Sequence, residues 1–475
     1  MARAMLIAGR IEDARAAVDA AMADSSDDDR ERLRLDADAA LTRLFSGEPV
    51  AARVAAEDAL TRAERCGEND VRQYANSVIC IASLQMGETP RAVTAGSRAI
   101  ELGGLSASAA HRYGAHIFFG TALMEADRLE EGERVLRDGH RLAEETGMVW
   151  QSIYYHAQLG LLRFDIGRWD DAMAELEASS LVSEENVGAP ATFAEAVMAV
   201  IEVHRGSLPR AEEHTAKARQ AIADGHRMGA DVAMWAAALV QEARGNGLDA
   251  LVTLENAWRL NLDMGFRAQN VRLSTELVRF ALAAGRRELA TAVAVELAEL
   301  AVLNPTSTRT GVARLCRGLV DADLELLHAA VLVYRESPRV AERAWACLAA
   351  APAFAKAGQR DEAISLLAEG AAGCERLGAA RDVAKAEAEL RELGAPRGRR
   401  GQRRRALTGW DSLTRTELDI VRLAVEGLSN AQIGERLYIS GRTVETHFSH
   451  VFTKLGVSSR VQVVAEAVRR LGTRA

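Results

Sequence analysis

The sequence lacks the features that would place it in a membrane or outside the cell. No stretch of 18 apolar residues is free of charge, and the apolar start from Met1 is interrupted by Arg10 and Glu12 too soon for a signal peptide. No Cys-x-x-Cys pair occurs among the five cysteines, which are Cys66, Cys80, Cys316, Cys347 and Cys374. We therefore expect a cytoplasmic protein, with no membrane partner, whose cysteines are reduced and buried as small apolar side chains.

Motifs for catalysis are also missing. Only four of the 59 basic residues are lysines, and none of the four follows a glycine, so the phosphate-binding pattern Gly-x-x-x-x-Gly-Lys-Ser/Thr does not occur. No Ser/His/Asp, Cys/His or paired-carboxylate arrangement stands out either. The sequence predicts a protein that is not an enzyme and that has no catalytic residue, cofactor or metal site.

What the sequence does contain is enough apolar residues for a large core and two parts of opposite charge. Its hydrophobic content is 48%, which is typical of globular proteins. The net charge is −8, but residues 396–475 carry fifteen basic against seven acidic side chains, or +8, so residues 1–395 carry −16. A basic module beside an acidic body favours nucleic acid as the partner of the smaller part.

Most of the chain repeats one short signature, in which a small or turn-forming residue is followed five positions later by Ala or Gly. The first eight copies start 38 to 40 residues apart. The nine copies are Gly9/Ala14, Gly47/Ala52, Gly87/Ala92, Asp127/Gly132, Gly167/Ala172, Gly206/Ala211, Gly245/Ala250, Gly285/Ala290 and Gly358/Ala363. The last gap is 73 residues, so we expect a degenerate copy around residues 321–328.

Each copy predicts a helical hairpin, because Gly caps the first helix and Ala lets the second pack closely. Such hairpins must stack to bury their apolar faces, so residues 1–393 are predicted to form an all-α superhelix. This part resembles the tetratricopeptide-like arrays of bacterial regulators, with a period of about 39. Only eight residues precede Gly9, so either a segment upstream of Met1 is missing or the first helix is a capping half-repeat.

Residues 394–407 predict a linker, because they lack apolar periodicity and contain six arginines within residues 394–405. This linker is either a solvated tether or an arm that grasps phosphates.

The remaining residues 408–475 predict a compact helical domain. Thr414 and Glu417 form one capping-box pattern, and Ser429 and Gln432 form a second. Ser440 can cap a third helix, over about residues 441–455, after a turn of only a few residues. Three short helices with a tight turn before the last define a helix-turn-helix arrangement.

The third helix divides into two faces. Its apolar residues recur at helical spacing and predict the core side; they are Val444, Phe448, Val451 and Leu455. The opposite stripe is predicted to face outward and can bond to base edges or phosphates; it holds Arg442, Glu445, Thr446, Ser449 and Thr453. By itself, such a stripe could equally be an ordinary solvent face.

Together these motifs resemble the LuxR-type DNA-binding domain over its whole length. The matching residues are Leu413, Glu417, Gly427, Ser429, Asn430, Ile433, Leu437, Ile439, Ser440, Thr443, Val444, Glu445, His447, Lys454, Leu455, Ser459 and Arg460. The resemblance implies that Glu445, Thr446 and Ser449 face the bases. It also implies that Thr443, Lys454 and Arg460 contact the DNA backbone.

Two further expectations follow for this domain. Many family members have a basic residue where Glu445 stands, and a carboxylate can only accept, for instance from a cytosine amino group. His447 has only His450 near it in the sequence as a second ligand, so a structural or phosphate-facing role is favoured over a metal. In the family the last helix pairs two copies, which implies dimerisation through Val461, Val464, Val468 and Leu471.

The chain resembles the back half of the large ATP-binding LuxR regulators, without their nucleotide-binding module. The resemblance implies a transcriptional regulator that binds double-stranded DNA as a homodimer, with RNA polymerase as a further partner and an effector on the array. The alternatives are a helical scaffold or adaptor whose terminal domain binds protein and, more weakly, kinship with sigma-factor DNA-binding regions.

The array offers one candidate effector site. Eight of the 22 aromatic residues fall between Tyr113 and Trp169. The candidate pocket residues among them and their neighbours are Tyr113, His116, Trp150, Tyr154 and Tyr155. Packing between helices explains such a concentration more often than a small-molecule pocket does.

Overall fold

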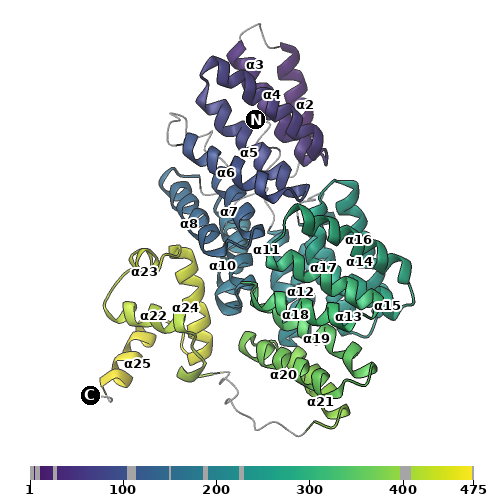
Figure 1. The fold of residues 1–475 in the computed structure, drawn as a ribbon. Helices are drawn as coiled ribbons and strands as arrows, with labels where there is room; N and C mark the ends of the chain where they lie inside the picture. The colour runs from purple at the N-terminus through teal and green to yellow at the C-terminus, as the bar shows by residue number, and fades with distance from the viewer. Residues whose placement is uncertain are drawn as a thin grey trace.

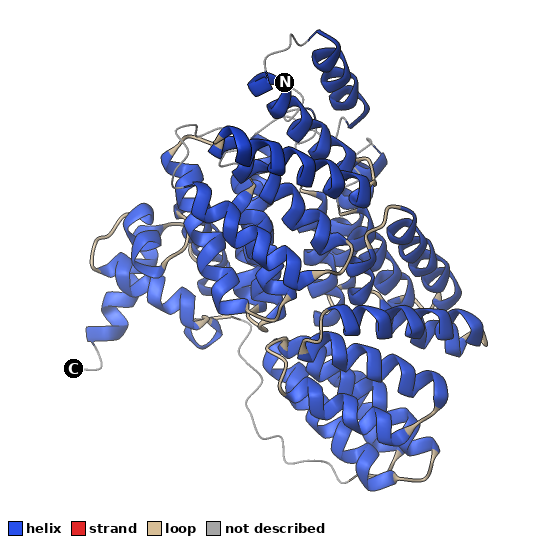
Figure 2. Cartoon of the chain, turned by 45° about the horizontal axis from the view of Figure 1, so that its top comes forward, coloured by secondary structure: helices blue, strands red, loops and turns tan. Residues whose placement is uncertain are grey.

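The computed structural model describes Met5 and residues 11–24, 29–103, 114–148, 151–185, 191–223, 229–395 and 408–472. Within these residues every regular element is a helix and no strand occurs (Figure 2). Figure 1 shows a long stack of paired helices and, beside it, a small helical domain that ends the chain. The predicted all-α fold, a tetratricopeptide-like superhelix followed by a helix-turn-helix, is confirmed.

The helices of the array run in chain order as antiparallel neighbours. They are α2 (Ile11–Asp24), α3 (Asp29–Phe45), α4 (Pro49–Cys66), α5 (Asn69–Gln85), α6 (Thr89–Gly103), α7 (Ala115–Glu125), α8 (Leu129–Glu145), α9 (Ser152–Asp165), α10 (Trp169–Glu185), α11 (Thr192–Arg205), α12 (Leu208–Ala223), α13 (Ala230–Ala243), α14 (Gly247–Asp263), η3 (Arg267–Arg272), α15 (Ser274–Ala283), α16 (Arg287–Leu303), α17 (Ser307–Asp321), α18 (Leu324–Arg335), α19 (Val340–Lys356), α20 (Arg360–Leu377) and α21 (Ala380–Glu392).

The terminal domain contains one short 3-10 helix and four α-helices. They are η4 (Trp410–Ser412), α22 (Arg415–Val425), α23 (Asn430–Leu437), α24 (Gly441–Leu455) and α25 (Arg460–Gly472).

The repeat signature works as the sequence predicts. Its described glycines all have a positive φ at the end of a hairpin's first helix, as at Gly87 with φ 88°. The alanines five positions later are fully buried where the two helices of a hairpin approach, as at Ala172 and Ala250. The degenerate copy is also confirmed, because α17 ends at Asp321, Ala322 caps it in the left-handed conformation with φ 54°, and α18 begins at Leu324. Gly9 lies outside the described residues.

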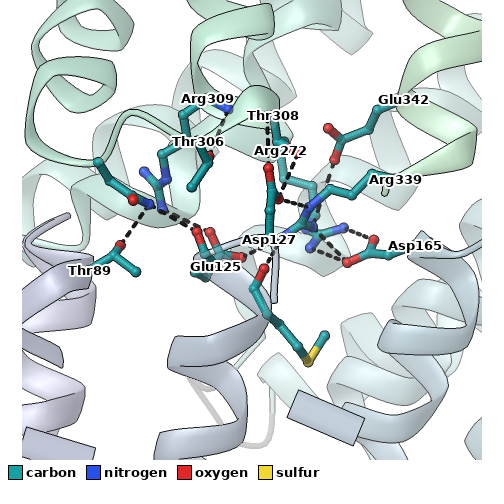
Figure 3. A network of polar contacts seen from close by, with 12 residues as sticks. Thr89, Glu125, Asp127, Asp165, Arg272, Thr306, Thr308, Arg309, Arg339 and Glu342 are labelled. Atoms are coloured by element: carbon teal, nitrogen blue, oxygen red, sulfur yellow. Dashed lines mark hydrogen bonds and ion pairs between the residues drawn. The ribbon is translucent and has the colours of Figure 1, made fainter. Parts of the chain in front are cut away.

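The superhelix brings together segments that are far apart in the sequence. The N-terminal half (residues 11–205) and the C-terminal half (residues 208–392) meet through polar groups (Figure 3). Arg339, which is 3% exposed, donates from Nη1 to Asp165 at 2.6 Å and from Nη2 to the carbonyl oxygen of Met124 at 2.9 Å. Arg309 donates to Glu125 at 2.8 Å. These bonds join helices separated by more than four repeats, so they close one turn of the superhelix.

Asp127 explains why one repeat has no glycine at its turn. It takes the left-handed conformation with φ 57°, which Asp tolerates better than most side chains. Its carboxylate accepts from the backbone N–H and the hydroxyl of Thr308, at 2.9 and 2.8 Å. Glycine would satisfy the turn but not this contact with the C-terminal half.

One expectation about the cysteines is wrong. Cys80, Cys316, Cys347 and Cys374 are buried and free, but Cys66 is exposed. Cys66 is the last residue of α4, where the chain leaves the helix pair toward solvent. Among the described helices, none is both long enough and apolar enough to span a bilayer.

We expect Arg339→Met to destabilise the array strongly. The substitution keeps the bulk of the side chain but leaves the buried Asp165 with one cation fewer, which typically costs about 3–5 kcal/mol of unfolding free energy. Urea denaturation followed by circular dichroism measures the loss. The control is Arg335→Met, because Arg335 pairs with Glu369 at the surface and such pairs contribute about 0–1 kcal/mol. If both variants lost the same unfolding free energy, Arg339 would not be the buried link between the two halves.

Candidate nucleic-acid interface

The terminal domain begins with two helices fixed by reciprocal caps. At α22, Thr414 Oγ1 accepts from the backbone N–H of Glu417 at 3.0 Å, and Glu417 Oε2 accepts from the backbone N–H of Thr414 at 2.7 Å. At α23, Ser429 and Gln432 make the same pair of bonds at 3.3 and 2.8 Å. Both capping boxes are therefore as the sequence predicts.

The turn before the third helix depends on two residues that the sequence reasoning did not single out. Tyr438 ends α23 in the left-handed conformation, with φ 57°. Gly434 lies so close to the turn that a Cβ there would be 2.5 Å from the carbonyl oxygen of Ile439. Ser440 then caps α24 by accepting from the N–H of Thr443 at 2.9 Å. A glycine inside a short helix, directly before a turn, was the available signal for this close approach.

Helix α24 uses the predicted apolar face for the core. Val444 and Val451 are fully buried, Phe448 is 4% exposed, and Leu455 packs partly buried beside them. The core of the domain thus forms between this face and helices α22, α23 and α25.

Two residues expected to contact the DNA backbone are engaged inside the domain. Lys454 donates to both carboxylate oxygens of Glu417, at 2.7 and 2.9 Å, and Glu417 is fully buried. Arg460 donates to Asn430 Oδ1 at 2.7 Å and to the carbonyl oxygen of Leu428, and its guanidinium lies 5.1 Å from the centre of the Phe448 ring. Both cations therefore hold the helices of the domain together in this structure.

The residues expected to face the bases are not equally accessible. Glu445 and Ser449 are exposed, and Glu445 pairs with Arg442 at 3.1 Å. The expectation that Thr446 faces outward is wrong for this structure, because Thr446 is only 4% exposed and its hydroxyl donates to the carbonyl oxygen of Arg442. The reason is that α24 packs against the repeat array on the side next to Thr446.

That packing joins α24 to α10, as Figure 1 shows. Thr443 Oγ1 donates to Glu175 Oε2 at 3.1 Å, and His450 Nε2 lies 2.8 Å from Glu177 Oε2. His447, which is 1% exposed, has Nε2 at 3.8 Å from Asp171 Oδ1. Three positions of α24, each about one turn after the last, thus meet three acidic residues of α10.

Charge strengthens this contact. Burial alone would raise the pKa of Glu175, but the hydrogen bond and charge of His156, 2.8 Å away, lower it to about 2. Burial lowers the pKa of His450, but the hydrogen bond and charge of Glu177 outweigh burial and raise it. The pKa of His447 is lowered by burial. The Glu177 carboxylate on α10 therefore favours the protonated form of His450.

Three potential metal ligands come together at the same place. The ligand atoms of Glu417, His447 and His450 lie within 4.8 Å of one another. Glu417 is already bound to Lys454, and His450 to Glu177. A metal would have to displace both ion pairs and face the Lys454 ammonium, so the chemistry of this group fits the protein's own pairs better than a cation.

The last helix, α25, leaves part of its apolar surface uncovered. Val461 is 77% exposed and Val468 is 51% exposed. Val464 packs partly buried against the domain core, where Val463 and Ala467 are buried. The side chain of Leu471 lies outside the described residues.

Of the candidate effector residues, one lines a cavity in the array. Tyr154 lies in its wall, whereas Tyr155 is 2% exposed and packs in the core against the ring of His140. His116 is half-buried, and its Cβ would lie 2.4 Å from a Cβ added at Gly139. Tyr113 and Trp150 lie outside the described residues.

The caps, the tight turn and the core of α22–α25 define a helix-turn-helix DNA-binding domain. Residues 411–467 match the family model described as bacterial regulatory proteins of the luxR family. The C-terminal domain of this chain is therefore a helix-turn-helix domain of the LuxR type.

Relatives share this domain. An HTH-type transcriptional regulator of Mycobacterium bovis is 60% identical over 76 residues, which are 16% of this chain and 8% of the relative. The transcriptional regulatory protein DegU of Brevibacillus brevis is 44% identical over 57 residues, 12% of this chain and 24% of that protein. The matched region thus spans less than a quarter of the length of either relative.

One solved structure is similar over the array. It is the crystal structure of a Rap protein complexed with Competence and Sporulation Factor, with a TM-score of 0.41 and 10% identity. The match covers 82% of this chain and 96% of that one.

We expect Lys454→Met to loosen the terminal domain. The variant leaves the fully buried Glu417 carboxylate without its cation, and breaking such a pair typically costs about 3–5 kcal/mol. Hydrogen exchange of the α22 and α24 amides in the full chain measures the effect locally. Arg422→Met is the control, because its pair with Asp419 is exposed. If α22 and α24 stay as protected as in the control, the internal role of Lys454 is wrong.

Proposed function

We propose that this chain is a transcriptional regulator whose repeat array holds its own DNA-binding domain in an inactive position. The working parts are the array (residues 1–393), the linker (residues 394–407) and the DNA-binding domain (residues 408–475). The observation that carries the proposal is the packing of α24 against α10 through Thr443, His447 and His450.

Geometry explains why this packing would exclude DNA. The major groove is about 12 Å wide, and a helix with its side chains is about 10–12 Å across. A recognition helix therefore fills the groove alone, and a second helix lying along its side cannot enter with it. α24 must therefore separate from α10 before it can reach the base edges.

Charge supports the same conclusion. Residues 1–395 carry −16, so DNA approaching the docked domain meets like charge. Glu175 accepts from the hydroxyl of Thr443, a residue that we propose contacts the DNA backbone. The α10 carboxylates thus take the places that phosphate oxygens would occupy.

In the released state, we propose that Glu445, Thr446 and Ser449 read the bases, with Arg442 beside them. Glu445 accepts from a cytosine amino group, because a carboxylate is repelled by guanine acceptors and by phosphate. Thr443, Lys454 and Arg460 then contribute to the backbone contacts, the last two while keeping the domain intact.

The exposed valines of α25 support a dimer on DNA. Val461 and Val468 form an uncovered apolar stripe that a second copy of α25 would bury. Val464 and Leu471 complete the proposed contact. Two copies related by a two-fold axis read an inverted repeat, and RNA polymerase is the proposed partner at the promoter.

Releasing the docked domain should strengthen DNA binding. Glu177→Lys replaces the acceptor of His450 with a cation, and hydrogen bonds to charged groups contribute about 1.5–3 kcal/mol, so we expect about a tenfold higher affinity. Fluorescence anisotropy of the full chain on selected operator DNA measures it. Glu213→Lys makes the same charge change on α12, where Glu213 pairs with Lys217. If Glu213→Lys raised the affinity for DNA as much as Glu177→Lys does, the gain would come from net charge and not from release of α24.

The base-reading role of Thr446 is tested in the released Glu177→Lys chain. Thr446→Ala should lower the affinity for an operator selected from random DNA by about fivefold or more, and barely change the affinity for unrelated DNA. The measurement is a mobility shift over a range of salt concentrations. Thr291→Ala is a matched control, because both hydroxyls donate to the carbonyl oxygen four residues earlier. A chain that binds no DNA, or a variant that keeps its preference, would favour a protein-binding adaptor.

A further inference from the structure

A cavity of about 340 Å³ lies inside the superhelix, where the two halves of the array meet. Its volume is at the lower end of the range of small-molecule sites. Most of its wall is apolar and is rich in aromatic rings; these include Phe45, Phe118, Tyr154, Phe193 and Phe266. Such a wall fits the body of a small organic molecule.

The cavity wall includes the polar network of Figure 3, in which three arginines face three carboxylates in addition to that of Glu342. Arg272, Arg309 and Arg339 each bond to carboxylates of the N-terminal half, as with Arg272 Nη1 and Asp165 Oδ1 at 3.0 Å. Those carboxylates belong to Glu125, Asp127 and Asp165. Each of the three arginines is therefore paired with a carboxylate of the protein itself.

Two further carboxylates that line the cavity, those of Asp231 and Glu342, have no arginine paired with them in this way. Asp231, 8% exposed, accepts only a long bond of 3.5 Å from Asn261 among the side chains of the described residues. Glu342 has its nearest described cation, Arg339 Nη1, 3.9 Å away, and its side chain is 22% exposed. Burial raises the pKa of Asp231, and it raises that of Glu342 to about 7, since neither charge is fully compensated.

A third acceptor on this wall has no partner. Gln85 is 8% exposed, and its Oε1 is buried without a hydrogen bond among the described residues. Asp231, Glu342 and Gln85 all supply acceptors, whereas the buried side-chain N–H groups on the wall that have no partner among the described residues, Nε and Nη1 of Arg309, belong to a cation already paired with Glu125. The acceptors of Asp231, Glu342 and Gln85 therefore lack a positively charged donor of their own. A protonated amine is a donor with no acceptor capacity, and it would compensate the surplus negative charge.

We propose that this cavity binds a small organic amine, with its apolar body against the aromatic wall and its ammonium group at Asp231 and Glu342. An anionic molecule is disfavoured, because it would meet two uncompensated carboxylates and no unmatched arginine of the network. The carboxylates of Glu342 and Asp231 are the groups that favour a positively charged ligand.

Helix α10 connects this cavity to the DNA-binding domain. Ser179 of α10 lies in the cavity wall and donates to the carbonyl oxygen of Ile153 at 2.8 Å, while Glu175 and Glu177 of the same helix bind α24. A ligand that moves the wall would move the helix that holds the recognition helix. This coupling rests on the proposed function, whereas the binding site itself does not.

The site is tested by calorimetry on the full chain with three probes that share one body: 4-phenylbutylamine, 4-phenylbutanol and 4-phenylbutyrate. We expect the amine to bind, the alcohol to bind at least about fivefold more weakly, and the carboxylate not to bind. Binding of the carboxylate as tightly as the amine, or no binding of the amine, would overturn the proposal.

Variants locate the binding. Glu342→Gln and Asp231→Asn should each bring the affinity of the amine close to that of the alcohol, and Glu336→Gln, an exposed residue of the neighbouring turn, should leave it unchanged. Ala157→Trp fills the apolar part of the cavity and should abolish binding of both amine and alcohol, with folding verified by circular dichroism. Amine binding that none of the cavity variants weakens would overturn the assignment.

The same samples separate this proposal from the regulatory one. If the amine binds with the expected variant effects and also raises the affinity for operator DNA, both stand. If it binds as expected but leaves DNA affinity unchanged in the full chain and in Glu177→Lys, the cavity site stands and its coupling to the DNA-binding domain fails.

Discussion

The structure depends on one buried guanidinium, that of Arg339, which joins the two halves of the array. A stack of hairpins in which each repeat touches only its neighbours has no fixed superhelical closure. Arg339 adds a contact across 174 residues to Asp165, and the Asp127–Thr308 bonds add another across 181. Because a buried charge is costly without partners, each of these groups is stable only when the turn is closed. Closure in turn encloses the cavity, whose walls come from both halves.

Helix α10, in the middle of the array, both lines the cavity and contacts the DNA-binding domain. One side of α10 faces the interior through Ser179, and another carries the acidic side chains that bind α24. Glu175 belongs to both environments, since it binds His156 of the array and Thr443 of the DNA-binding domain. A change in the packing of α9 and α10 would therefore reach the recognition helix without any long chain of intermediates.

Opposite charge is a second reason why the array and the terminal domain associate. Residues 396–475 carry +8 and residues 1–395 carry −16, so the two parts attract each other. In the proposed function, the array and DNA compete for the same face of α24. His450 and Thr443 can bond either to carboxylates or to phosphates, because both offer negatively charged oxygen acceptors. The proposed function requires that the array hold α24 more weakly than an operator does. Partly exposed pairs such as His450–Glu177 suit that role better than fully buried ones.

The sequence by itself determined the local structure. Glycine at most of the repeat turns, alanine at most of the close approaches and the caps at Thr414, Ser429 and Ser440 act within a few residues, so they could be predicted and are present in the structure. Tertiary structure decided the rest. Nothing in the local sequence shows that Arg339 reaches Asp165, that Asp231 and Glu342 share one cavity wall, or that Thr446 is covered beside α10. Those outcomes depend on how repeats hundreds of residues apart pack, and a periodicity of about 39 residues does not encode that geometry.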